Sequence, residues 1–138
     1  MSAECGVRNA EFGVRSKERG VPGAGLRERT KSFALQIIKA VEGLPKNRTA
    51  EVIGRQLLRC GTSVGANYRA SCRAKSQADF IAKMGIVEEE ADETIYWMEL
   101  LIESGVVRSG ALTELLNEAN QIVAMTVASI RTARRNRA

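Results

Sequence analysis

One segment in the middle of the chain constrains the fold more than any other, because its apolar and small residues recur with a helical period. These positions are separated alternately by four and three residues: Phe80, Met84, Val87, Ala91, Thr94, Met98 and Leu101. Such spacing puts the side chains on one face of an α-helix for about six turns. Acidic residues fill many of the other positions, so this helix must bury its apolar face against other helices.

Three further segments carry helical patterns and supply the partners. We expect helices over residues 26–42, from about residue 50, and from residue 109 or 110 onward. Four helices with short connections favour antiparallel neighbours. The predicted fold class is therefore all-α, an antiparallel up-down-up-down four-helix bundle.

The bundle is predicted to occupy residues 26–134. Residues 1–25 are rich in glycine and have no helical apolar period, so we expect a disordered or non-native N-terminal tail. Residues 135–138 are predicted to form a short basic C-terminal tail.

Local signals suggest how the helices begin and pack. Thr49 is a suitable N-cap for the second helix, and the sequence from Ser76 to Asp79 resembles a capping box that opens the third. Gly61 and Gly65 fall inside the second helix, where each glycine costs about 1 kcal/mol relative to alanine. We expect them to permit close approach of a neighbouring helix.

The absence of histidine excludes many kinds of active site. The chain has no histidine, so no Ser-His-Asp or Cys-His arrangement and no Glu-x-x-His di-iron site can form. The acidic run at residues 88–93 points around most of its helix instead of converging on one ion. We expect no catalytic residues, no cofactor and no metal; a carboxylate-only metal site is the enzymatic alternative.

The three cysteines do not suggest a metal or redox motif, because none forms a C-x-x-C pair. On one helix, Cys60 and Cys72 would be roughly 18 Å apart, too far for a disulfide bond between them. We expect both to be small, buried or half-buried thiols. The chain also has no apolar run of about 18 residues, so we expect no membrane span and a cytoplasmic location.

Charge is distributed unevenly along the chain. Residues 79–118 contain ten acidic and two basic residues, a net charge of −8, and because the whole chain carries +5 the other residues carry +13. Four arginines of the second helix fall within about 80° of one another, opposite the apolar face: Arg55, Arg59, Arg69 and Arg73. They are candidate nucleic-acid-binding residues, since guanidinium groups along a helix can follow phosphates. The alternative is a solvated face, or ion pairs with the acidic third helix.

Two apolar side chains suggest a second buried surface. Trp97 lies about 100° from the core line of the third helix, and Ile86 lies within about 20° of Trp97 around the axis. Ile86 and Trp97 are therefore candidate oligomer-interface residues. Alternatively, Trp97 simply covers the edge of the four-helix core.

Three sequence stretches together resemble a known family. They are Ser63-Val64-Gly65-Ala66-Asn67, then Ser76-Gln77-Ala78-Asp79-Phe80, then the segment 85–94. They are similar to the four-helix-bundle family of 23S rRNA intervening-sequence proteins, which is related to the accessory protein of diversity-generating retroelements. The chain departs from many members after Asn67, where it reads Tyr68-Arg69-Ala70-Ser71 in place of Ala-Glu-Gly.

The resemblance implies an up-down bundle that assembles into a ring, typically a homopentamer, with no established enzymatic activity. It implies structural roles for the residues that match the motif: Ser63, Asn67, Ser76, Asp79 and Phe80. It implies that Asn67 forms a hydrogen bond near the turn between the second and third helices. The retroelement relatives use basic surfaces to bind nucleic acid and a reverse transcriptase.

These observations predict a non-enzymatic, oligomeric bundle that serves as a nucleic-acid-associated accessory protein. Its expected partners are further copies of itself, RNA or DNA, and a reverse transcriptase or other protein. The alternative is a protein-protein interaction scaffold that does not bind nucleic acid.

Overall fold

The structure, a computed structural model, describes residues 25–137 and contains four helices in this range. They are α1 (Leu26–Glu42), α2 (Arg48–Ser71), α3 (Gln77–Glu103) and α4 (Thr113–Arg137). The described residues contain no strand, which confirms the prediction of an all-α chain with four helices. The predicted N-terminal tail lies, apart from Gly25, outside the described residues. Helix α4 continues to Arg137, three residues beyond the predicted end of the bundle.

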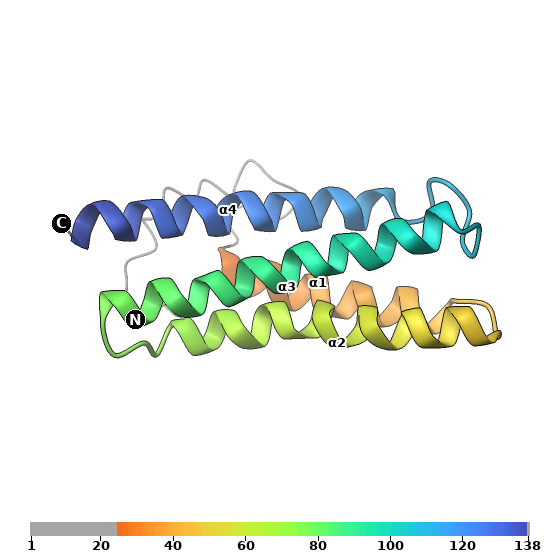
Figure 1. Ribbon diagram of the computed structural model, residues 1–138, viewed down its shortest axis with the longest axis horizontal. Helices are drawn as coiled ribbons and strands as arrows, with labels where there is room; N and C mark the ends of the chain where they lie inside the picture. The colour runs from red at the N-terminus through yellow and green to blue at the C-terminus, as the bar shows by residue number, and fades with distance from the viewer. Residues whose placement is uncertain (1–24, 138) are drawn as a thin grey trace.

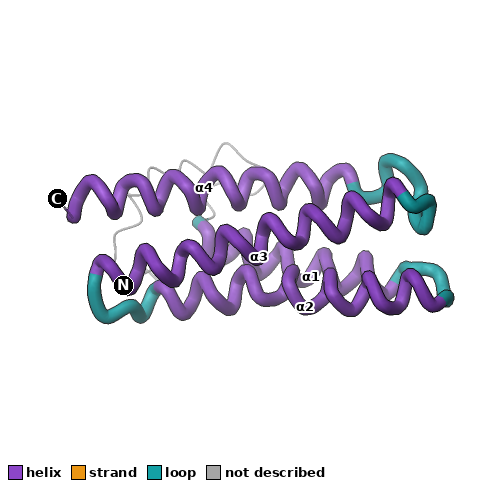
Figure 2. The backbone as a smooth tube through the Cα atoms, viewed as in Figure 1, coloured by secondary structure: helices purple, strands orange, loops and turns teal. Residues whose placement is uncertain are grey.

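The four helices pack around a single core. Contacts join α1 to α2, α2 to α3, α3 to α4 and α4 back to α1, so each helix touches two others. Figure 1 shows the helices lying lengthwise beside one another, with the connecting loops at alternate ends of the molecule. The tube in Figure 2 shows that these loops are short relative to the helices.

The core contains the seven positions of α3 from which the fold was inferred. The buried residues of α3 are those seven: Phe80, Met84, Val87, Ala91, Thr94, Met98 and Leu101. They pack in one cluster with buried side chains from the other three helices, including Phe33 of α1, Tyr68 of α2 and Ile122 of α4. The alternating spacing therefore identified the inner face of α3 correctly.

Helices α1 and α2 approach each other closely at the predicted glycines. A Cβ atom added at Gly61 would lie 2.9 Å from two side-chain carbons of Ile37, and one at Gly65 would lie 3.1 Å from Thr30 Oγ1. A Cβ atom added at Gly54 would lie 2.9 Å from Leu44 Cδ1, in the connection between α1 and α2. The prediction that Gly61 and Gly65 permit close packing is confirmed.

Two predicted helix starts differ from the structure. The N-cap of α2 is Asn47, whose Oδ1 accepts a hydrogen bond of 2.8 Å from the Ala50 amide, so the assignment of Thr49 was wrong. Asparagine and threonine are both suitable caps, and sequence alone did not distinguish them. Helix α4 begins at Thr113, later than predicted, because the preceding connection contains two glycines with positive φ, Gly105 and Gly110.

The cysteine prediction holds for one residue and fails for another. Cys60 is a free, buried cysteine. Cys72 is disulfide-bonded, so its assignment as a thiol was wrong. The helical separation excluded only a bond between Cys60 and Cys72.

Candidate nucleic-acid interface

The four predicted arginines do not share one environment. Arg55 is exposed on α2, and its Nη2 lies 3.9 Å from an oxygen of Glu51, one turn earlier on the same helix. Arg69 is half-buried in the last turn of α2. Arg73 is exposed in the turn that follows α2. These three guanidinium groups keep at least part of their surface in water.

Arg59 is held by carboxylates of α3. Its Nη1 lies 3.4 Å from Glu90 Oε1 and its Nη2 lies 2.5 Å from Glu93 Oε2. This is the ion-paired alternative that the sequence left open. The Arg59 charge is largely compensated, so the row of arginines is interrupted near its middle.

The Arg59 pairs belong to a larger contact between α2 and α3. Glu93 Oε2 also accepts a hydrogen bond of 3.0 Å from Trp97 Nε1. Beneath it, the Thr94 hydroxyl lies 3.3 Å from the Cys60 sulfur, and burial raises the pKa of the Cys60 thiol. The network ties the two helices together and leaves little freedom to Arg59.

The candidate interface residues of α3 differ in exposure. Ile86 is 41% exposed, whereas Trp97 is half-buried and packs against the core cluster. The ring of Tyr96 lies edge-on to Trp97, with centroids 5.1 Å apart. Trp97 therefore covers the edge of the core, and Ile86 is the more accessible of the two.

The residues of the family motif lie within helices or at a cap. The Ser63 hydroxyl donates to the Arg59 carbonyl at 2.7 Å, and Asn67 Nδ2 donates to the Ser63 carbonyl at 2.9 Å. The Asn67 bond thus lies inside α2, one turn back, instead of at the turn between α2 and α3. Phe80 is buried in the core.

Ser76 and Asp79 form the cap of α3. The Ser76 hydroxyl accepts from the Asp79 amide at 3.0 Å, and Asp79 Oδ2 accepts from the Lys75 amide at 3.0 Å. The other Asp79 oxygen accepts from Lys83 Nζ at 2.7 Å. These bonds lower the pKa of the Asp79 carboxyl.

A shallow groove between α1 and α2 gathers basic side chains that the sequence did not single out. We call it the α1–α2 groove; its volume is about 250 Å³, and it is lined by Arg27, Thr30, Lys31, Ala34, Thr62, Gly65, Ala66 and Arg69. Two of its cations come from α1 and one from α2. The pattern of a single helix face does not reveal Arg27 and Lys31, because only the pairing of α1 with α2 places them beside Arg69.

The positive charges of the α1–α2 groove are not compensated nearby. No acidic residue lines it among the residues that the structure describes. Within the described part of the chain, no ion pair or side-chain hydrogen bond engages Arg27, Lys31 or Arg69. The groove is therefore a concentrated patch of free positive charge.

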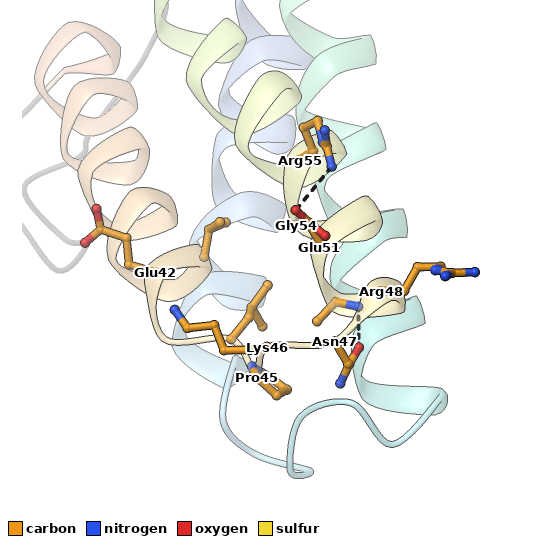
Figure 3. Close-up of a pocket in the computed structure, with 11 residues that line it drawn as sticks. Glu42, Pro45, Lys46, Asn47, Arg48, Glu51, Gly54 and Arg55 are labelled. Atoms are coloured by element: carbon orange, nitrogen blue, oxygen red, sulfur yellow. Dashed lines mark hydrogen bonds and ion pairs between the residues drawn. The ribbon is translucent and has the colours of Figure 1, made fainter.

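A larger cavity at the connection between α1 and α2 has mixed charge. Its volume is about 920 Å³, and Figure 3 shows the side chains around it. Glu42 and Glu51 line it together with Lys46, Arg48 and Arg55. In Figure 3 the Arg55 side chain is joined to Glu51. Because both signs are present, this cavity has less electrostatic preference for anions than the α1–α2 groove.

Two kinds of feature are absent from the described residues. No group of three or more histidine, cysteine or acidic side chains is arranged to hold a metal ion in the described range. Over residues 25–137, no helix has both the length and the apolar character needed to cross a membrane.

The fold and the surface define a small four-helix bundle with a cationic groove on one pair of helices. A family model for the 23S rRNA-intervening sequence protein matches residues 26–128, which is most of the chain and all but the end of the bundle. The chain belongs to the 23S rRNA-intervening sequence protein family.

A solved structure shows the same fold. It is the crystal structure of a protein of unknown function from the S23 ribosomal protein family of Bacteroides thetaiotaomicron VPI-5482. The sequences are 34% identical, the TM-score is 0.72, and the match covers 76% of this chain and 94% of the other. A search of curated proteins found no match.

Proposed function

We propose that this protein is a non-enzymatic, oligomeric up-down bundle that binds nucleic acid through the phosphate backbone. The observation that carries the proposal is the separation of charge. Arg27, Lys31, Arg69 and Arg73 have no ion-pair partner among the described residues, whereas carboxylates of α3 are occupied by Arg59 and Lys83. The family description, which refers to 23S rRNA, supports RNA as the first nucleic acid to test.

Free cations at a surface favour polyanions for a general reason. Neutralising phosphates releases condensed counterions, and this release contributes affinity without reading the base sequence. The chain has few aromatic residues, with one tryptophan, two tyrosines and three phenylalanines, so stacking on single-stranded bases contributes little. We therefore expect binding that depends on charge and favours structured nucleic acid.

Salt dependence tests this function. Fluorescence anisotropy with a labelled RNA duplex and a DNA duplex of equal length should show affinity falling steeply between about 50 and 200 mM salt. Arg59 is unsuitable for charge reversal, because a glutamate there would face Glu90 and Glu93. Absent binding at 50 mM salt, or binding that does not respond to salt, would contradict the proposal.

Self-association is the second part of the proposal. A closed ring, for example a pentamer, would bring several basic surfaces into one electric field and raise the affinity for a long polyanion. The exposed Ile86 side chain supports such an interface on α3. Sedimentation velocity of the purified protein measures the subunit number, and a monomer at micromolar concentration would contradict this part.

A scaffold without nucleic-acid binding is the second candidate function. Four exposed apolar side chains on α1 and α2 favour it: Leu35 at 58%, Ile38 at 36%, Val52 at 53% and Leu58 at 36%. Such side chains suit a protein partner, including the reverse transcriptase that the family resemblance implies. Absent RNA binding at low salt, with retained association to a protein partner, would favour this function. The cytoplasmic location stays a prediction.

A further inference from the structure

We infer that the α1–α2 groove is the site at which the phosphate backbone of an RNA duplex lies. This inference rests on the proposed function and specifies where on the bundle it is carried out. It moves the binding site from the outer face of α2 alone to the junction of α1 and α2. It also assigns Arg27 and Lys31 a role in binding.

The groove presents cations from two walls. Arg27 and Lys31 lie four residues apart on α1, about 6 Å along the helix axis, and Arg69 stands on α2. Two walls of cations can contact a chain of phosphates from both sides. A single helical face would contact it from one side only.

The uncharged residues that line the groove have short side chains. Ala34, Gly65 and Ala66 contribute at most a methyl group each. Gly65 is packed so tightly against Thr30 that an added Cβ would lie 3.1 Å from the threonine hydroxyl oxygen. Among the described residues that line the groove, only the three cations have long side chains, so a phosphodiester group can approach them.

The two threonine hydroxyls that line the groove already form hydrogen bonds within their own helices. The Thr30 hydroxyl donates to the Leu26 carbonyl at 2.7 Å, and the Thr62 hydroxyl donates to the Leu58 carbonyl at 2.7 Å. Neither hydroxyl proton is free for a ligand in this arrangement. Recognition in the groove therefore depends on charge, which matches a phosphate backbone better than a base or a neutral ligand.

The partial burial of Arg27 and Arg69 favours phosphate binding. Arg27 and Arg69 are half-buried, so their aliphatic parts are partly fixed against the protein, while no carboxylate of residues 25–137 binds their guanidinium groups. Less side-chain freedom is then lost when a phosphate binds. Arg55, by contrast, is exposed and already lies 3.9 Å from the Glu51 carboxylate.

A matched pair of double variants tests the groove. Lys31→Gln with Arg69→Gln removes two charges from it. Lys39→Gln with Arg48→Gln removes the same residue types from the same two helices outside it. Lys39 lies about 12 Å from Lys31 along α1, beyond the Debye length of about 8 Å at physiological salt.

Anisotropy with the RNA duplex at 100 mM salt gives the readout. Each phosphate contact releases about one counterion when it forms. The loss of two contacts should therefore make the groove variant bind RNA on the order of 50-fold more weakly, and the slope of its log affinity against log salt concentration should fall by about 2. The control should lose no more than about 3-fold, because its charges are screened from the groove. Circular dichroism and thermal unfolding of both variants verify the fold.

A single exposed position provides a second test. Ala66 is exposed at the groove, so Ala66→Glu places a carboxylate there without disturbing the core. Ala66→Gln has nearly the same shape without the charge. We expect the glutamate to weaken RNA binding at least about 10-fold more than the glutamine, since a like charge repels phosphate.

The outcomes separate the inference from the proposed function. Salt-dependent binding by the wild type, with equal losses in the two double variants, would overturn the groove and leave the function standing. No binding by the wild type at 50 mM salt would overturn both.

Discussion

The Arg29 guanidinium of α1 forms a two-point ion pair with the Glu118 carboxylate of α4, with Nε to Oε2 at 2.9 Å and Nη2 to Oε1 at 2.7 Å. The arginine side chain is 1% exposed and the glutamate 23%. Arg29 Nη1 is buried and has no hydrogen-bond partner. Because α1 packs less extensively on α4 than on α2, this ion pair is one of the main contacts between α1 and α4.

Removing the acidic partner should therefore be costly. Glu118→Gln leaves the Arg29 charge buried and uncompensated, and we expect it to lower the free energy of unfolding by about 3 kcal/mol. Urea denaturation followed by circular dichroism measures this change. Arg29→Met is the control: it removes the buried charge, and the partly exposed Glu118 can be hydrated, so the loss should be smaller. Equal stability of Glu118→Gln and the wild type would show that the pair is unimportant.

The glycines of the helices give a second prediction, in which one substitution has opposite effects at two sites. Gly61→Ala places a methyl group 2.9 Å from the buried Ile37, and we expect a loss of about 1 to 3 kcal/mol despite the better helix propensity of alanine. Gly85→Ala on α3 meets nothing within 4 Å and should gain about 0.5 to 1 kcal/mol. Thermal unfolding of both variants measures whether each substitution raises or lowers the stability. A stabilised Gly61→Ala would mean that α1 and α2 can separate easily.

The fold was largely predictable because its signal lies within single helices. The seven inner positions of α3 follow from their spacing alone, and the close approach of α1 to Gly61 follows from a glycine inside a helix. Arg29 shows the limit of this reasoning. Its position lies on the core side of α1, beside Thr30, but an arginine is normally placed in water, and the Glu118 that permits its burial is 89 residues away.

The candidate site was less predictable because it depends on which helices are neighbours. The helical pattern of α2 correctly placed Arg55 and Arg59 on its outer side. It could not show that Glu90 and Glu93 of α3 would form ion pairs with Arg59. Nor could it show that α1 would bring Lys31 beside Arg69. Such pairings are set by the relative rotation of packed helices, which no single-helix pattern contains.

Asp79 gives a prediction about pH. Hydrogen bonds from Lys83 and the Lys75 amide lower its pKa in the folded state, so its contribution to stability is complete above the unfolded pKa of about 4 and is lost as the pH falls through the lower folded value. The difference in urea midpoint between the wild type and Asp79→Asn should be constant from pH 5 to 7 and shrink below about pH 4.

A second aspartate of α3 serves as the control for this pH dependence. Asp92 is exposed and has no hydrogen-bond or ion-pair partner among the described residues, so Asp92→Asn should show no comparable trend. A difference for Asp79→Asn that persists unchanged to pH 2.5 would mean that the carboxylate charge does not contribute through these bonds.

The exposed Ile86 side chain leads to a prediction about assembly. If copies of the chain associate through this part of α3, Ile86→Glu buries an unpaired carboxylate in each interface and should weaken association about 100-fold, equivalent to about 3 kcal/mol. Sedimentation velocity should then show a smaller species.

The control for this variant is a somewhat more exposed apolar residue on another helix. Val52 of α2 is 53% exposed, and Val52→Glu adds the same charge away from α3. It should leave the sedimentation coefficient unchanged. Because Ile86 lies outside the buried core, a smaller species that keeps its helical circular dichroism would reflect a lost interface, whereas an unfolded chain would show that Ile86 stabilises the single bundle. An oligomer that survives Ile86→Glu but is dissociated by Val52→Glu would place the interface on α2 and contradict the assignment to α3.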